Sequence, residues 1–139
     1  MAVTACIPTQ AKADFLAGVH LAADVYKCAL YTQAAATLDA TSTTYSTTGE
    51  LATANGYTQG GTTMAGYTSA TSGTLGYLDW TTDPNWPTSS ITADAAVIYN
   101  SSKTNKIIGI LTFTSATSSN GTWTLQLPAP GATAVIRMA

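Results

Sequence analysis

Apolar residues recur near the start of the chain at the spacing of an α-helix. The apolar stripe of such a helix would hold Ala11, Phe15, Leu16 and Val19. Thr9 stands where a side chain can cap the first turn, and Pro8 lies just outside it. The pattern therefore predicts an amphipathic helix of about three turns that ends near His20 or Leu21.

After this helix the pattern changes to the alternation of β-strands. Residues 25–32 and residues 91–100 place successive side chains on opposite faces. Residues 106–113 are apolar on both faces, which predicts a central strand that is covered on both sides and pairs with residues 91–100. The core residues expected in that strand are Ile108, Ile110 and Leu111.

Turn residues divide most of the remaining chain into shorter strands. Residues 63–69 and 74–80 are predicted to form a hairpin joined through residues 70–73. Residues 122–127 and 134–138 are expected to be the last two strands, and Trp123, like Tyr99 and Phe113, is expected to pack in the core.

Two segments do not have the pattern of a strand. Residues 33–56 are rich in Ala, Thr and Ser without a strong period, and are interpreted as a long excursion with a helical turn near residues 38–42 and a short strand near residues 50–54. Residues 83–87 hold two prolines, which remove backbone donors and fix φ, so a loop is predicted there. Trp86 in that loop would either fold over the end of the domain or face a partner.

Short strands, frequent turns and one early helix predict a mainly β fold. The expected architecture is a single-domain β-sandwich or small β-barrel with a short N-terminal helix. A chain of 139 residues fits one core, with residues 1–9 as an N-terminal arm and residues 10–139 as the domain.

The composition agrees with a packed β domain, and the net charge excludes some classes of partner. Hydrophobic residues make up 45% of the chain and charged residues only 9%, while 27 Thr favour half-buried strand surfaces. Net charge is −2 with five basic residues, so no nucleic-acid or membrane-surface partner is expected. Residues 11–23 are too short and polar to span a membrane and lack the features of a signal peptide, so assembly in the cytosol is predicted.

Cys6 and Cys28 are the only cysteines. They would form one disulfide in an oxidising environment or remain a free pair in the cytosol, and both alternatives stay open. His20 is the only histidine, which leaves too few soft ligands for a metal site, so neither a metal nor another cofactor is expected.

The sequence offers no pattern typical of catalysis. His20 follows the predicted helix and is interpreted as a structural or surface histidine rather than the base of a nucleophile. Seven carboxylates are scattered singly along the chain. Asp79 and Asp83 flank Trp80 and suggest a glycosidase pair, but solvation of a strand end and a loop explains them as well. The chain is therefore not predicted to be an enzyme.

Five segments together resemble a family of small structural proteins of tailed bacteriophages. They are residues 25–32, 44–51, 56–61, 91–100 and 121–130. The resemblance implies a non-enzymatic virion component, best described as a head decoration or cement protein that binds and stabilises the assembled shell of major capsid protein. It also implies a homo-oligomer, with a trimer favoured, located in the virion after assembly in the host cytoplasm.

Two surfaces are candidates for the contact with the partner. The N-terminal arm is apolar and shows neither helical nor strand periodicity. The loop at residues 83–87 offers an aromatic side chain on a segment made rigid by two prolines. The candidate interface residues are Ala2, Val3, Ile7, Pro8, Trp86 and Pro87. Alternative functions are a tail or connector component, or a receptor- or carbohydrate-binding module that uses Trp86, Trp80 and loop tyrosines to stack on sugars.

Overall fold

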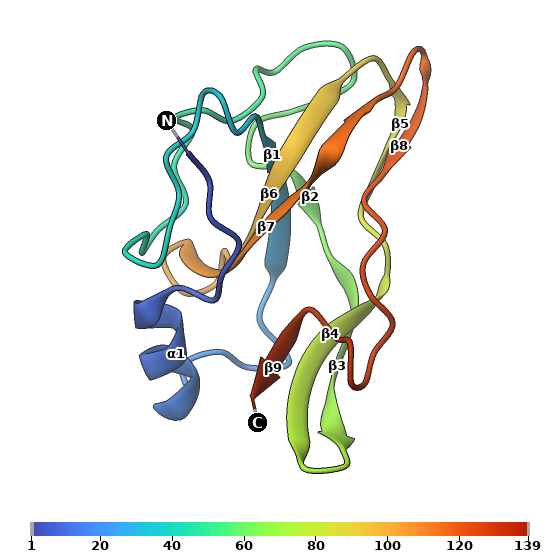
Figure 1. The fold of residues 1–139 in the computed structure, drawn as a ribbon. Helices are drawn as coiled ribbons and strands as arrows, with labels where there is room; N and C mark the ends of the chain where they lie inside the picture. Colours follow the sequence, from blue (N-terminus) through green and yellow to red (C-terminus); the bar gives the residue numbers. More distant parts are fainter. Residues whose placement is uncertain (1, 139) are drawn as a thin grey trace.

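The structure is a computed structural model that describes residues 2–138 (Figure 1). Within this range the chain forms one helix, α1 (Thr9–Leu16), followed by strands in chain order. The strands are β1 (Tyr26–Tyr31), β2 (Thr62–Thr63), β3 (Ala65–Ser72), β4 (Leu75–Thr82), β5 (Asn85–Ser89), β6 (Thr92–Asn100), β7 (Lys106–Thr117), β8 (Gly121–Thr124) and β9 (Ile136–Met138). The prediction of a mainly β chain with one short N-terminal helix is confirmed.

The strands form three antiparallel sheets that pack as a small sandwich. The largest has the order β2-β1-β6-β7, the second has the order β3-β4-β9, and β5 pairs with β8. In the largest sheet β1 runs against β6 from the Tyr26–Asn100 pair to the Tyr31–Ala95 pair. These sheets remain open within residues 2–138, so of the two expected architectures the sandwich is the one observed.

The central strands of the four-stranded sheet, β1 and β6, are buried on both faces. One face contributes Leu30, Ile98 and Ile108 to a core that also holds the tryptophans and Ile136. The other face contributes Tyr31, Val97 and Ile110 to a second cluster. Val3 of the N-terminal arm and Leu38 of the excursion cover this second cluster. Strands that are apolar on both sides therefore have a layer above and a layer below them.

The strand predicted at residues 106–113 exists and pairs with β6, but it is not central. β7 is the outer strand of its sheet, and the central strands are β1 and β6. Ile108 and Ile110 are buried as expected, whereas Leu111 is half-buried. Burial on both faces reflects cover by two layers, and it does not determine the position of a strand within the sheet.

The helix is shorter than its sequence pattern predicts. Pro8 is the residue before the first turn and makes no side-chain cap, and Thr9 is already helical. Ala17 ends α1, and Gly18 follows with a φ of +69°, a left-handed conformation that stops a helix before His20. Leu16 is 84% exposed, so it does not belong to a buried stripe.

The hairpin predicted after residue 62 is confirmed, with longer strands. β3 and β4 pair from Tyr67–Trp80 to Ser72–Leu75, so only residues 73–74 form the turn. Gly73 has a φ of +61°, as a tight hairpin turn requires. β9, the last predicted strand, pairs with β4 on the side away from β3.

The loop predicted at residues 83–87 is wrong. Asn85–Ser89 form β5, which pairs with β8 through Asn85–Thr124 and Trp86–Trp123. The register shifts between Trp86 and Ser89, and Pro87 lies within this irregular stretch. A proline is tolerated there because the irregular stretch of a two-stranded sheet does not need its backbone donor.

The excursion between β1 and β2 contains turns and isolated bridges rather than regular elements. The expected helical turn reduces to one backbone bond from Ser42 N to Asp39 O. The expected short strand reduces to bridges at Glu50 with Tyr31 and at Ala54 with Tyr57. The excursion is joined to the sheet by side chains and by single backbone hydrogen bonds, such as those from Leu51 N to Leu30 O and from Ile107 N to Thr43 O.

Candidate functional site

The N-terminal arm, predicted to be free for a partner, lies on its own domain. Val3 and Pro8 are buried, Ile7 is half-buried and Ala2 is exposed. The Cys6 backbone exchanges two hydrogen bonds with Ile110 on the outer edge of β7, at 3.1 and 2.9 Å. Further backbone bonds join Thr4 and Ala2 to Leu38. The expectation of a free arm is thus overturned, because these groups already have partners in the same chain.

The second predicted contact, Trp86, is also inside the molecule. Its side chain is 5% exposed and packs against Tyr57 and Trp123, with ring centroids 5.9 and 5.6 Å away. Trp80 is buried as well, and of the two contacts predicted in this region only Pro87 is exposed. Neither tryptophan ring is available at the surface to stack on a sugar.

The two cysteines are free thiols. Cys6 lies beside β7 while Cys28 lies on β1, and β7 and β6 stand between them. Three strand spacings amount to about 14 Å, roughly twice the Cα separation that a disulfide can bridge. Burial raises the pKa of Cys6, and it raises that of Cys28 to about 12. A bridge within the chain is therefore incompatible with this fold.

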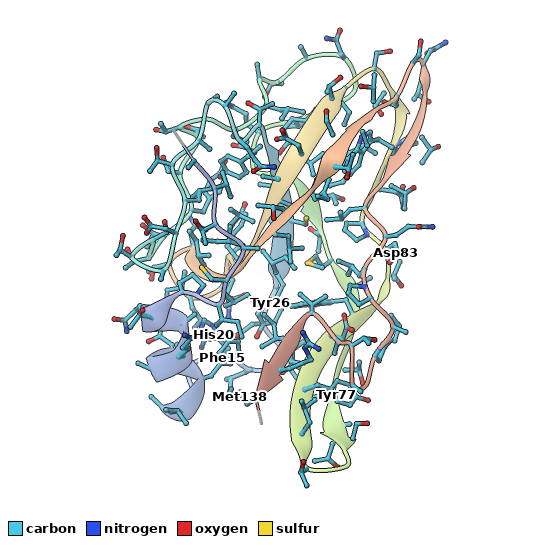
Figure 2. The ribbon with its side chains drawn as sticks, viewed as in Figure 1. Phe15, His20, Tyr26, Tyr77, Asp83 and Met138 are labelled. Atoms are coloured by element: carbon cyan, nitrogen blue, oxygen red, sulfur yellow. The ribbon has the colours of Figure 1, made fainter. Side chains whose placement is uncertain are left out.

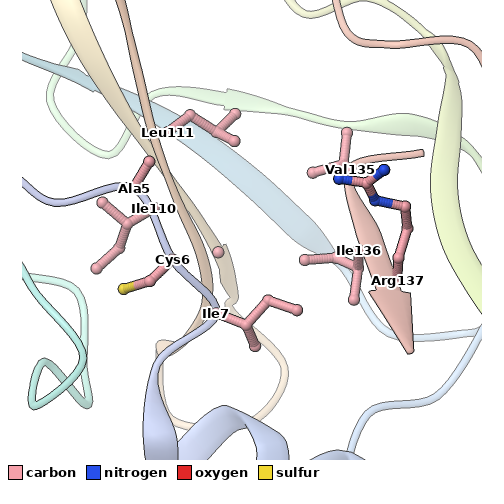
Figure 3. Close-up of a pocket in the computed structure, with 9 residues that line it drawn as sticks. Ala5, Cys6, Ile7, Ile110, Leu111, Val135, Ile136 and Arg137 are labelled. Carbon is pink, nitrogen blue, oxygen red and sulfur yellow. The ribbon is translucent and has the colours of Figure 1, made fainter. Parts of the chain in front are cut away.

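Beside Cys6, a groove of about 280 Å³ separates the arm and β7 from β9 (Figure 3). Its walls are mainly aliphatic, with Ile7, Ile110 and Ile136 among them. Arg137 on β9 also lines the groove, and its guanidinium donates to the carbonyl of Ala132 at 2.9 Å. The groove is a seam between two sheets that holds one positive charge.

His20 is buried, as a structural histidine would be. Asn100 Nδ2 donates to the Asp24 carboxylate at 2.8 Å and lies 3.0 Å from His20 Nδ1. His20 Nδ1 is therefore the acceptor, the proton resides on Nε2, and the ring is neutral. Burial lowers the pKa of His20, which favours the same neutral form. Nε2 is buried and has no hydrogen-bond partner among residues 2–138.

Charged residues surround this histidine and join α1 to the β6–β7 turn. Asp14 of α1 accepts a hydrogen bond from Lys106 at 3.0 Å. Asp24 lies 3.7 Å from Lys103. These contacts position His20 within the framework of the fold.

The carboxylates at positions 79 and 83 both bind backbone groups. Asp79 is fully buried and accepts from Trp80 N at 2.8 Å and from Val135 N at 3.4 Å, and burial raises its pKa. Asp83 accepts from Leu127 N at 2.9 Å. They hold the chain between β8 and β9 against β4. The expected solvation of a strand end is therefore wrong for Asp79, because backbone N–H groups rather than water solvate its carboxylate.

Sequence reasoning missed a cluster around Glu50. The carboxylate is 8% exposed and accepts from Tyr45 Oη at 2.6 Å, from Tyr57 Oη at 2.7 Å and from Gly60 N at 2.7 Å. Tyr57 Oη in turn accepts from Leu30 N at 2.9 Å. The signal available in the sequence was one glutamate among tyrosines in a segment otherwise rich in Thr and Ala.

Further tyrosines extend this cluster. Tyr45 stacks on Tyr99 with centroids 4.4 Å apart, Tyr99 Oη donates to Gly60 O at 2.7 Å, and Tyr31 Oη donates to Ser46 O at 2.6 Å. Burial raises the pKa of Tyr99 to about 12, so the phenol stays protonated and keeps donating. The cluster fixes the excursion to β1 and β6.

Exposed large apolar side chains belong to α1, the segment that follows it and β9. Their exposed fractions run from 44% to 84%, and they are Leu16, Leu21, Val25 and Met138. We call this set the apolar end. The C-terminal turn of α1, the chain leading to β1, and β9 all lie in the lower part of the molecule in Figure 1.

A cavity of about 310 Å³ opens at the apolar end (Figure 2). Phe15 and His20 line one side, and Tyr67, Tyr77 and Met138 come from the three strands of the second sheet. The walls combine aromatic rings with aliphatic side chains such as Leu78 and Ile136, and no lining side chain is ionised. This region can take up apolar groups, and it is the surface feature that sequence reasoning did not identify.

Comparison with known proteins adds no relative. No family model matches the chain, and neither a curated protein nor a solved structure matches it. Within residues 2–138 no three His, Cys, Asp or Glu side chains gather in a way that could hold a metal ion. In the same range no helix has the length and apolar character needed to cross a bilayer.

Proposed function

We propose that this chain is a non-enzymatic structural protein of a tailed-bacteriophage virion, and specifically a decoration protein that binds the assembled shell of major capsid protein. The resemblance of five sequence segments to such proteins is the reason for naming the virion. The apolar end is the structural observation that supports a protein partner, because exposed apolar side chains gathered on one region are typical of interaction sites.

The hydrophobic effect favours contact between the apolar end and the surface of a partner. Moving one large aliphatic side chain from water to a packed environment contributes about 1.5–3 kcal/mol. Leu16, at 84% exposed, gains nearly all of that only on contact with another surface. The cavity lined by Phe15 and Met138 can accept an apolar side chain of the partner. Many weak contacts of this kind suit a shell that presents identical sites in many copies.

A particle-binding experiment tests the proposal. Purified protein is mixed with shells of the source phage that lack it, and the bound fraction is measured after sedimentation. Wild-type protein is expected to sediment with the shells. Leu16→Asp and Leu21→Asp are expected to bind at least about tenfold more weakly, because a carboxylate replaces a buried apolar contact.

Thr124→Asp is the matched control, since Thr124 is exposed on β8, outside the apolar end, and should bind as the wild type does. Electron microscopy of the particles with bound protein shows which part of the particle it occupies. A repeated density over the head supports decoration, whereas density at one vertex or along the tail assigns a tail or connector role. Absence of binding to any part of the particle would refute the proposal.

A further inference from the structure

β3 presents an open strand edge with an unusual composition. It is the outermost strand of the second sheet, with β4 as its only neighbour among the described strands. From Tyr67 to Ser72 it keeps a regular register with β4, so this part of the edge has no bulge. Residues 65–72 include no charged residue and no proline.

Edge strands normally carry a feature that prevents pairing with another chain. The other outer strands described here have one. β5 contains Pro87 and an irregular register, its partner β8 has four residues, β9 has three residues including Arg137, and β2 has two residues. β7 is met by the arm at Cys6, and its register with β6 is irregular between Thr112 and Ala116. β3 has eight residues, and beyond Gly66, whose φ is +79°, the stretch Tyr67–Ser72 lacks these protections.

We propose that the β3 edge pairs in antiparallel fashion with the β3 edge of a second copy of this chain. The pairing would join the three-stranded sheets of the two copies into a single six-stranded sheet with the order β9-β4-β3-β3-β4-β9. This inference goes beyond the proposed function and does not depend on it. It also replaces the trimer expected from the family resemblance with a two-fold dimer.

The chemistry of the strand favours its own copy as the partner. An uncharged edge pairs best with another uncharged edge, and antiparallel self-pairing makes every contact twice around a two-fold axis. It also sets the exposed Ser69 and Thr71 against serine and threonine hydroxyls of the other copy, which can hydrogen-bond across the joint. Figure 1 shows the β3–β4 hairpin projecting from the lower end of the molecule.

Charge substitutions on β3 test the pairing directly. By sedimentation equilibrium, the wild-type protein is expected at twice its 14.2 kDa mass. The double variant Ser69→Lys/Thr71→Lys places four positive charges on one face of the joint and is expected to be monomeric. The variant Ser69→Glu/Thr71→Glu should be monomeric for the same reason. An equal mixture of the two is expected to restore the dimer.

Thr124→Lys adds a lysine to an exposed position of β8 and should leave the dimer intact. Circular dichroism of each variant confirms its fold. A wild type that stays monomeric at millimolar concentration would overturn the proposal, as would charge variants that remain dimeric or a mixture that stays monomeric. If the variants do not fold, amide exchange in the wild type decides: alternate β3 amides should gain protection as concentration rises, and equal exchange at all concentrations contradicts the pairing.

Discussion

At the scale of single residues, stability depends on a few buried groups that bind distant parts of the chain. Glu50 joins two tyrosines and a backbone amide of the excursion, and through Tyr57 it reaches β1. Asp79 acts in the same way at the second sheet, and His20 does so at the end of β6 through Asn100. Their residue types are visible in the sequence, but their partners are not, because those partners are brought close only by the fold.

Glu50→Gln should lower the free energy of unfolding by about 2–3 kcal/mol. The amide nitrogen would face a hydroxyl or backbone N–H that now donates to a carboxylate oxygen, leaving a buried donor without an acceptor. Urea unfolding measures the change. Asp39→Asn, in the same excursion but bonded locally to Thr41, serves as the control with a smaller loss. If the Glu50→Gln variant proved as stable as the wild type, the cluster would contribute little to stability.

Ile110→Ala should cost about 2–5 kcal/mol, because the side chain is 1% exposed and its removal leaves a cavity beneath the arm. Leu16→Ala removes a similar volume from an exposed position and should change stability by less than about 0.5 kcal/mol. Both are measured by urea unfolding. Equal losses for the two variants would contradict the burial that separates them.

His20 should make the protein less stable in mild acid. Burial holds its pKa in the folded state below the ordinary 6.5, so as pH falls the unfolded chain takes up the proton first. The stability that the neutral ring contributes is present above pH 6.5 and decreases from there towards the folded pKa. Urea midpoints at pH 7.0 and 5.5 measure it, and His20→Gln should remove most of the difference.

The carboxylates near His20 act at lower pH. Burial opposes ionisation of Asp14 and Asp24, but hydrogen bonds from Lys106 and Asn100, with other contacts, outweigh it and hold both pKa values below the usual 3.8. Their contribution is lost only as pH falls from about that value downwards. Burial raises the pKa of Asp79, so its effect on stability is opposite: ionisation of this carboxyl lowers the stability as pH rises above 3.8. A His20→Gln protein with an unchanged loss between pH 7.0 and 5.5 would assign the effect to another group.

At the scale of elements, alternation in the sequence predicted β1 and β6, a run that is apolar on both faces predicted β7, and turn residues predicted the β3–β4 hairpin. The sequence pattern failed for β5, because two prolines suppress the strand pattern while the irregular register accommodates Pro87. It also misplaced β7 in the sheet order, since periodicity reports which side chains are covered and does not report which strands are neighbours. The early end of α1 depends on the conformation of Gly18, which a glycine permits but does not require.

The N-terminal arm behaves as an element of the sheet, so its deletion should destabilise the domain. Removing residues 2–7 exposes Ile110, eliminates the burial of Val3 and breaks backbone bonds to Leu38 and Ile110. The expected loss exceeds about 2 kcal/mol. Urea unfolding of the shortened chain measures it, with Ala5→Ser, an exposed substitution within the arm, as the control. A truncated chain of unchanged stability would return the arm to the role of a free attachment segment.

At the scale of the whole molecule, the two proposed contacts are neighbours, because Tyr67 and Ser69 of β3 line the cavity at the apolar end. The shell would meet the apolar end, and a second copy would meet the β3 edge. The sequence did not indicate the apolar end because Leu16 fits the helical stripe by spacing, and only the short α1 and the placement of β9 reveal its exposure. The β3 strand itself was predicted, but its position at an edge was not, because sheet order is a tertiary property.

The pairing of β1 with β6 also has a consequence for the order in which the chain folds. Tyr26 and its partner Asn100 are 74 positions apart, whereas β3–β4 and β6–β7 are hairpins of neighbouring strands. Closing a long loop costs more entropy than closing a short one, so we expect the hairpins to form first and β1 to dock last. Pulse-labelled hydrogen exchange during refolding would then protect amides of β6 and β7 before those of β1. During synthesis, β1 would leave the ribosome long before its partner exists, and a holding chaperone would have a hydrophobic strand to bind throughout that interval.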